Sequence, residues 1–123
     1  MDISIVIPLY NEAESLPELF KRIQAVMEQN RFSFEVIFVD DGSKDASWQV
    51  ITELKAAHPE LIRALKFRRN YGKSPALYCG FNKAEGEVVF TMDADLQDSP
   101  EELPEMYRML IEGNYDLVSG WKK

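Results

Sequence analysis

The sequence predicts an α/β fold in which a mostly parallel sheet carries helices on both faces. Three observations lead to this prediction. Short apolar runs rich in β-branched residues recur along the 123 residues, as expected for strands buried on both sides. Segments with apolar residues at helical spacing lie between these runs. The connections are only a few residues long, which suits parallel strands joined through helices that pack on the sheet.

The first half of the chain contains two strands and two helices. The run ISIVIPL at 3–9 reads as a buried strand, and a helix begins at Ser15 with Glu18 at the spacing of a capping box. A second buried strand, FEVIFVD, covers 34–40 and is followed by the turn residues DGSKD. Apolar residues at helical spacing then predict a helix over 48–58.

The second half repeats the same order of elements. Strands are predicted at 61–67, 87–93 and 115–120. Helices are predicted over 74–84 and 99–112, and each begins with a serine followed by proline, the residue favoured at the first helical position. Because the fifth strand is followed by only three more residues, we expect the chain to be part of a longer protein.

Length and charge restrict the kinds of partner. The 123 residues suffice for one domain, and 14 basic against 21 acidic residues give a net charge of −7. Such a surface repels phosphate backbones, so nucleic acid is not an expected partner. Four basic residues do cluster and could hold one compact anion: Lys66, Arg68, Arg69 and Lys73.

Cysteine content and hydropathy restrict the compartment. The single cysteine, Cys79, excludes an internal disulfide and fits a reducing environment. The N-terminus does not resemble a signal peptide. No apolar run approaches the roughly 18 residues that a membrane span requires. We therefore expect this chain to be soluble and cytoplasmic.

Two aspartates follow the fourth predicted strand, where ligands of open α/β sheets bind. With one residue between them, Asp93 and Asp95 can point the same way, and Mg²⁺ or Mn²⁺ would neutralise their repulsion. Gln97 could add a carbonyl oxygen. The alternative is that both aspartates only cap the helix that begins near Ser99.

The other strand ends are polar as well. Asp40 and Asp41 could accept hydrogen bonds from a nucleobase or a ribose, or they could only cap the next helix. Tyr10 could stack on a base in a pocket shaped by Pro8. Lys73 could meet a phosphate, or it could be an ordinary solvated lysine.

Four motifs together resemble a known family. In order and spacing, VIPLYNE, VDDGSKD, RRNYGKSPALYCGFNKAEGE and FTMDADLQDSPEELP are similar to the nucleotide-binding half of family 2 inverting glycosyltransferases. The likeness is closest to the branch that transfers sugars to polyprenyl phosphates, such as dolichol-phosphate mannose synthases. It covers essentially the whole chain.

This resemblance implies a GT-A fold, which is Rossmann-like and three-layered. It also implies a nucleotide-diphosphate-sugar donor (UDP-, GDP- or dTDP-linked) and a divalent metal, Mg²⁺ or Mn²⁺. The residues that match the family's nucleoside pocket are Pro8, Tyr10, Glu12, Val39 and Asp41, with Asp40 beside them and Ala94 against the nucleotide. The residues that match the metal ligands, and so assist departure of the leaving group, are Asp93, Asp95 and Gln97.

The sequence also departs from the family pattern. Lys122 stands near the position where relatives commonly have an arginine, and would meet phosphate as a point charge. The family's general base, its acceptor-side residues and any membrane helices would lie beyond residue 123. We therefore expect this chain to bind donor and metal but to transfer sugar poorly or not at all. The full-length protein is expected at the cytoplasmic face of a membrane, with polyprenyl phosphate as acceptor.

Two alternatives remain open at this point. The segment VVFTMDADLQ also resembles the Asp-x-Asp strand end of haloacid-dehalogenase phosphatases, although there the motif lies on the first strand. Alternatively, the chain is a nucleotide-binding module without catalytic activity.

Overall fold

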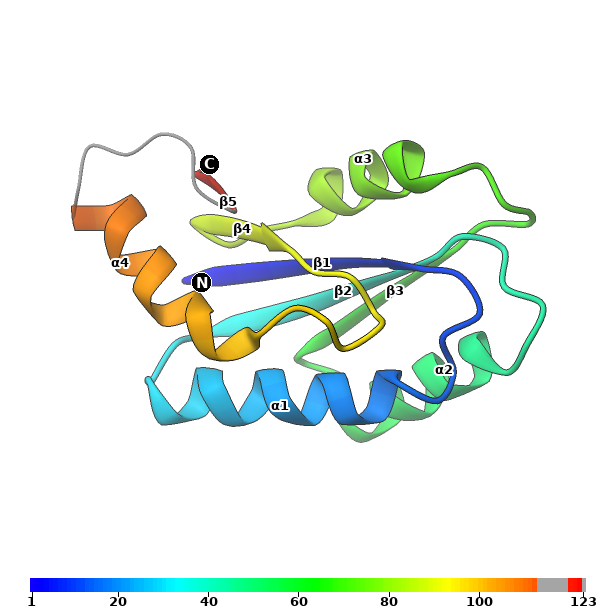
Figure 1. Ribbon diagram of the computed structural model, residues 1–123, viewed down its shortest axis with the longest axis horizontal. Helices are drawn as coiled ribbons and strands as arrows, with labels where there is room; N and C mark the ends of the chain where they lie inside the picture. Colours follow the sequence, from blue (N-terminus) through cyan, green and yellow to red (C-terminus); the bar gives the residue numbers. More distant parts are fainter. Residues whose placement is uncertain (113–119, 123) are drawn as a thin grey trace.

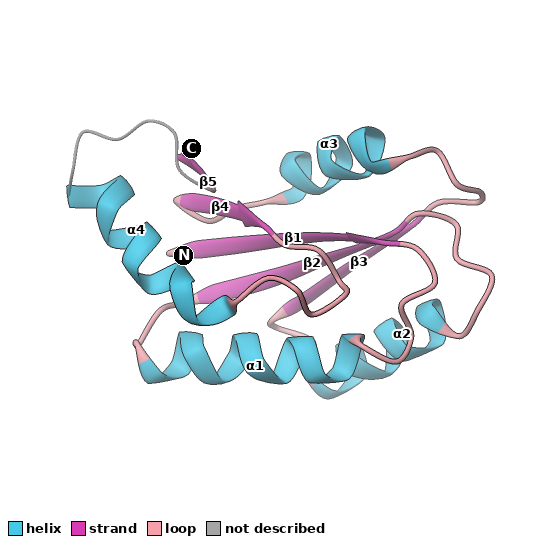
Figure 2. Cartoon of the chain, viewed as in Figure 1, coloured by secondary structure: helices cyan, strands magenta, loops and turns pink. Residues whose placement is uncertain are grey.

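The computed structural model describes residues 1–112 and 120–122. The strands are β1 (Ile3–Leu9), β2 (Phe34–Asp40), β3 (Ile62–Lys66), β4 (Val88–Thr91) and β5 (Gly120–Lys122). The helices are α1 (Leu16–Gln29), α2 (Ser47–Ala57), α3 (Lys73–Lys83) and α4 (Leu103–Glu112), with the 3₁₀ turn η1 (Pro100–Glu102) directly before α4. Figure 2 shows how helices and strands alternate along the chain.

The strands form one sheet in the order β3-β2-β1-β4-β5, in which β1 to β4 are parallel. The prediction of a mostly parallel sheet is confirmed. Strands β1 and β2 have the predicted bounds, because both are continuous buried runs paired along seven residues. Strand β4 is shorter than predicted, since it pairs with β1 only from Val88 to Thr91. Most of the strand predicted at 115–120 lies outside the described residues, and β5 runs antiparallel to β4 from Gly120.

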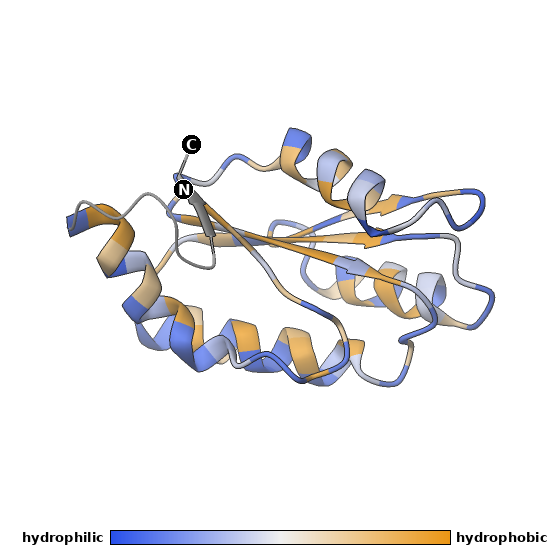
Figure 3. Cartoon of the chain, turned by 45° about the horizontal axis from the view of Figure 1, so that its top comes forward, coloured by the Kyte–Doolittle hydropathy of each residue, from blue (hydrophilic) through white to orange (hydrophobic). Residues whose placement is uncertain are grey.

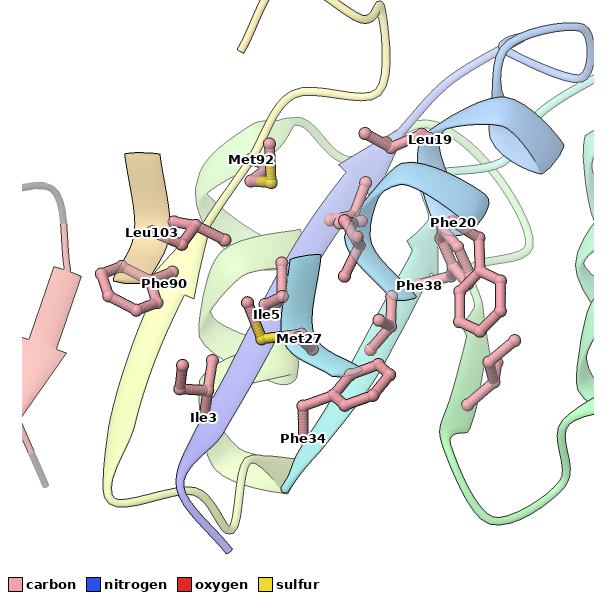
Figure 4. Packing of buried hydrophobic residues seen from close by; sticks show 14 of the residues in the cluster. Ile3, Ile5, Leu19, Phe20, Met27, Phe34, Phe38, Phe90, Met92 and Leu103 are labelled. Carbon is pink, nitrogen blue, oxygen red and sulfur yellow. The ribbon is translucent and has the colours of Figure 1, made fainter. Parts of the chain in front are cut away.

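Side chains that alternate along the strands build a core on each face of the sheet. Helices α1 and α2 cover one face and α3 the other (Figure 1). The η1 turn contacts α1, and Leu103 at the start of α4 belongs to the larger core. Figure 4 shows Ile5, Met27 and Phe38 in the larger core. The smaller core on the α3 face consists of Val6, Ile37, Val39, Ala76, Ala84 and Val89. In Figure 3 the hydrophobic strands lie between helices that carry polar residues outward. The predicted three layers are confirmed.

The helix starts differ from the sequence prediction in detail. Ser15 precedes α1, but its side chain makes no capping hydrogen bond, so the predicted capping box does not form. The residue before α3 is Gly72, not Ser74, and Ser99 precedes η1 before α4 begins at Leu103. The hydroxyls of these serines bond to other acceptors or to solvent and not to the backbone of the helix. A local sequence motif does not predict these alternative partners.

A polar network is buried at the amino ends of the strands, opposite the end where β1 leads into α1. The carboxylate of Glu35, 2% exposed, accepts hydrogen bonds from the Ser4 hydroxyl (2.6 Å) and the Glu85 N–H (2.8 Å). Its other oxygen lies 3.2 Å from Arg63 Nε. The Ser4 hydroxyl in turn accepts the Gly86 N–H at 2.7 Å. This network joins β1, β2, β3 and the segment before β4.

Gly80 allows α3 to lie close against the sheet. A Cβ at this position would overlap the Val6 side chain and lie 3.4 Å from Val39 Cγ2, and both valines are fully buried. Gly-to-Ala substitution within a helix normally stabilises by up to about 1 kcal/mol. Here we expect Gly80→Ala to destabilise by about 1–3 kcal/mol in urea denaturation, because the core is overpacked. The control is Asn82→Ala, at an exposed position of the same helix, which should not lose stability. If Gly80→Ala were more stable than the unmodified chain, the close packing of α3 on the sheet would be contradicted.

Within residues 1–112 and 120–122, no helix is both long and apolar enough to cross a bilayer.

Candidate functional site

The loops that follow β1, β2 and β4 meet at one edge of the sheet, because parallel strands end at the same edge (Figure 1). Two adjoining hollows lie there. The smaller, of about 140 Å³, is lined by Pro8, Leu9, Tyr10, Asp41, Lys73 and Asp93. The larger, of about 250 Å³, is lined by Pro8, Leu9, Tyr10, Glu12, Asp93, Ala94 and Asp95. The structure therefore brings together eight of the residues singled out in the sequence.

Asp41 is engaged with the loop that leads into α3. One oxygen of its buried carboxylate accepts the Tyr71 N–H at 2.7 Å, and the other accepts the Gly72 N–H at 3.0 Å. The loop is thus held on the end of β2, which places Lys73, the next residue, beside the smaller hollow. A contact of Asp41 with a nucleobase stays a prediction, and it would add to this loop-holding role.

Asp40 and Val39 lie beneath the site. Both side chains are fully buried, and neither lines the two hollows. One oxygen of Asp40 accepts the Ser43 N–H at 2.8 Å, and the other has no hydrogen-bond partner among the described residues. Asp40 therefore shapes the turn after β2 in the way that a capping aspartate does.

The loop after β1 is tied to the loop after β2 by Asn11, which the sequence analysis missed. Its side-chain oxygen accepts the Lys44 N–H at 2.8 Å, and its own N–H donates to the Ser43 hydroxyl at 2.8 Å. Asn11 has a φ of 55°, a left-handed conformation that asparagine adopts more readily than most residues. Nearby, a hydrogen bond with Ser47 holds the pKa of Asp45 below its ordinary value.

Lys73 and Asp93 form an ion pair between the two hollows, with 2.9 Å between Nζ and Oδ1. Their side chains are 62% and 52% exposed. Exposed pairs contribute only about 0–1 kcal/mol. The ion pair can therefore break with little loss of free energy. The lysine would then be available to bind an anion, and the aspartate to bind a cation.

The turn after β4 exposes two carboxylates. The Asp93 N–H donates to Asp98 at 2.9 Å, and the Gln97 N–H donates to Asp95 at 3.2 Å. Leu96 takes a φ of 66° to complete the turn. Gln97 is exposed and lines neither hollow. Across the described ranges no three His, Cys, Asp or Glu residues gather as a metal site, so Asp93 and Asp95 would bind a cation only together with other ligands.

The backbone of Lys122 does not lie at this edge. In the antiparallel pairing its backbone lies opposite Val88, at the start of β4, whereas Asp93 follows the end of that strand. Over Gly120–Lys122 the antiparallel direction of β5 carries the backbone away from the carboxyl edge. A phosphate contact of Lys122 stays a prediction.

Comparison with known proteins identifies the family. Residues 4–122 match the family described as Glycosyl transferase family 2. The chain is 45% identical over 117 residues to an undecaprenyl-phosphate 4-deoxy-4-formamido-L-arabinose transferase from Pseudomonas fluorescens (strain SBW25), covering 95% of this chain and 34% of that protein. A protein of the same name from Sodalis glossinidius is 46% identical over 116 residues, covering 94% and 35%. The chain spans about a third of the length of these curated relatives.

Solved structures with the same architecture bind sugar nucleotides. A mannosyltransferase from Pyrobaculum calidifontis, in complex with GDP-Man and Mn²⁺, superposes with a TM-score of 0.77 and 28% identity over 89% of this chain and 32% of that one. TarS 1–349 of S. aureus, in complex with UDP-GlcNAc, gives a TM-score of 0.73 and 26% identity over 91% and 32%. The sheet and helices are therefore those of a GT-A fold. The chain belongs to glycosyltransferase family 2.

Proposed function

We propose that residues 1–123 are the donor-binding part of a glycosyltransferase that moves a sugar from a nucleotide diphosphate to a polyprenyl phosphate. The observation that carries this proposal is the meeting of Tyr10, Lys73 and the Asp93–Asp95 turn around two adjoining hollows. An aromatic ring, a cation and a pair of carboxylates are what a base, a pyrophosphate and its metal ion require. The names of the relatives support the acceptor class, since they are undecaprenyl-phosphate sugar transferases.

The nucleoside would bind against Tyr10. Tyr10 is 39% exposed and lines both hollows, so its ring would be accessible for stacking on a base. Pro8 and Leu9 provide apolar walls, and Glu12 lines the larger hollow, where a carboxylate can accept hydrogen bonds from ribose hydroxyls. Which base is bound would depend on the buried Asp41 and on the backbone around it.

Asp93, Asp95 and Gln97 would hold Mg²⁺ or Mn²⁺. The donor set fits, because Mg²⁺ commonly takes one or two protein carboxylates and completes its shell with water and substrate phosphate oxygens. The metal ion, when bound, would neutralise charge on the departing nucleoside diphosphate. Lys73, once released from Asp93, would lie within reach of the same pyrophosphate and add a positive charge there.

The acceptor would attack the anomeric carbon opposite the leaving group, with inversion. A lipid phosphate is already largely ionised near neutral pH, because its second pKa is about 6. Such an acceptor needs less help from a general base than an alcohol does. The phosphatase alternative has lost its basis now that the family covers residues 4–122. A nucleotide-binding module without transfer activity remains the alternative.

Calorimetric titration tests the donor site. UDP, GDP and dTDP are titrated with and without Mn²⁺ into the unmodified chain, into Asp95→Asn and into Glu53→Gln, an exposed charge control on α2. We expect one nucleotide to bind in a metal-dependent manner, with at least a tenfold loss of affinity in Asp95→Asn and no change in Glu53→Gln. Binding that ignores both the metal and Asp95→Asn, or no binding at all, would overturn the proposal. Sugar transfer to polyprenyl phosphate is then assayed with the matching donor, and we expect residues 1–123 to transfer the sugar poorly or not at all.

A further inference from the structure

Ser15 has the position of a helix cap but not the contacts of one. It directly precedes α1, yet its hydroxyl makes no bond to the first turn of the helix. Instead the hydroxyl donates to the carbonyl oxygen of Ala94, 79 residues further along the chain. A serine before a helix normally accepts a backbone N–H from the first turn. Here the hydroxyl acts as a donor that reaches from the loop before α1 to the turn after β4.

The Ala94 carbonyl is the central group of that turn. Ala94 is 4% exposed and packs in the larger core, whereas Asp93 and Asp95 on either side are exposed. Because the peptide group is planar, fixing the Ala94 carbonyl also fixes the direction of the Asp95 N–H and the departure of its Cα. The Asp98 carboxylate holds the Asp93 N–H in a similar way at 2.9 Å. The turn is therefore fixed on both sides of Ala94.

The surroundings of the Ser15 hydroxyl require a hydrogen-bond donor. Besides Ala94, its oxygen lies 3.1 Å from the carbonyl oxygen of Glu12 and 3.3 Å from Glu12 Oε2. All three neighbours are acceptors when the Glu12 carboxylate is ionised, and a hydroxyl has one proton to donate. A carboxylate in place of this hydroxyl would face three acceptors, although aspartate is among the best helix caps. The two possible roles of Ser15 thus make opposite demands on the side chain.

We propose that Ser15 is a positioning residue for the Asp93–Asp95 turn: it holds the two carboxylates in place before the metal ion and the nucleotide arrive. This inference rests on the proposed function, because it assigns the turn to metal-dependent nucleotide binding. Without the hydroxyl, the turn would have to be ordered at the moment of binding, and the affinity falls accordingly. Binding that does not involve the metal ion would be affected little.

Three substitutions separate positioning from capping: Ser15→Ala, Ser15→Thr and Ser15→Asp. Titration with UDP and with GDP in the presence of Mn²⁺ should show a loss of about tenfold for Ser15→Ala and a return to within about twofold for Ser15→Thr, which keeps the hydroxyl. Ser15→Asp should bind more weakly than Ser15→Ala even if its melting temperature is the highest of the three. If Ser15 is only a cap, Ser15→Asp will instead match or exceed the unmodified chain in both stability and affinity, and the inference fails.

A second measurement distinguishes failure of this inference from failure of the proposed function. In ¹⁵N-labelled chain without ligand, Ser15→Ala should shift or broaden the amide signals of residues 93–98, most strongly that of Asp95, and Ser15→Thr should leave them near their original positions. Unchanged signals in Ser15→Ala would overturn the inference whatever the binding data show. If the unmodified chain binds no nucleotide with Mn²⁺, the proposed function falls and takes the role in binding with it, while these signals still show whether Ser15 orders the turn.

Discussion

Gly42→Ala is expected to destabilise the chain by about 3 kcal/mol or more. Gly42 follows β2 with a φ of 79°, a left-handed conformation that strains residues with a Cβ. A Cβ here would also overlap the backbone of Arg69 and lie 2.6 Å from the backbone nitrogen of Asn70. Both obstacles are main chain, so no side chain can turn away to make room. Overpacking of about 1–3 kcal/mol adds to the conformational strain.

The same substitution should also affect the site. The backbone that a Cβ would displace leads directly to Tyr71 and Gly72, whose amides are bonded to Asp41. Movement of this segment would carry Lys73 away from Asp93 and from the smaller hollow. Nucleotide affinity in the folded fraction should therefore fall together with stability.

Gly72→Ala is the matched control, measured beside Gly42→Ala by guanidinium denaturation. Gly72 also has a left-handed φ, 108°, but a Cβ there would meet only Pro75 Cδ at 3.9 Å, an ordinary contact. With a ψ of 168° its conformation is one that glycine almost alone adopts, so its loss should be limited to conformational strain of about 1–3 kcal/mol. Equal losses for the two variants would show that the close approach of Gly42 to the backbone of residues 69–70 does not affect stability.

The sequence predicted the elements that depend on local pattern. Strands at 3–9 and 34–40 were predicted with the observed bounds, because both are long apolar runs followed at once by turn residues. The position of the site followed from topology, since the polar residues after parallel strands must share an edge. Asp93, Asp95, Tyr10 and Lys73 do line the hollows at that edge.

What the sequence could not predict depends on contacts between distant segments. The sequence around Ser15 matches a local capping motif. In the structure its hydroxyl instead donates to a carbonyl oxygen 79 residues away. Asp41 was assigned to a ligand, yet two backbone amides 30 and 31 residues away already occupy its oxygens. The direction of β5 was equally open, because an apolar strand carries no signal for parallel or antiparallel pairing.

Glu35→Ala is expected to be the most destabilising change at the opposite end of the sheet. Removal of this buried carboxylate would leave the Ser4 hydroxyl and the Glu85 N–H without their acceptor and Arg63 without its closest buried partner. Breaking a buried ion pair from one side typically destabilises by about 3–5 kcal/mol. Arg63 is 39% exposed and can regain water, so the lower end of that range is expected. Glu35→Gln, which keeps one acceptor oxygen and the side-chain shape, should lose about 1–2 kcal/mol.

Glu85→Ala provides the comparison that isolates burial as the cause. Glu85 contacts the same arginine at 3.1 Å, but its side chain is 62% exposed, so the loss should stay below about 1 kcal/mol. In urea denaturation, the free energy of unfolding of Glu35→Ala should therefore be well below those of Glu35→Gln and Glu85→Ala. Similar losses of stability for Glu85→Ala and Glu35→Ala would contradict a role for burial.

The same substitutions should leave the nucleotide site unaffected. Ser4, Glu35 and Arg63 lie near the amino ends of their strands, whereas the Asp93–Asp95 turn follows the carboxyl end of β4. The folded fraction of Glu35→Gln should therefore bind nucleotide with unchanged affinity. Substitution in the network at the amino ends of the strands should thus lower stability without lowering ligand affinity.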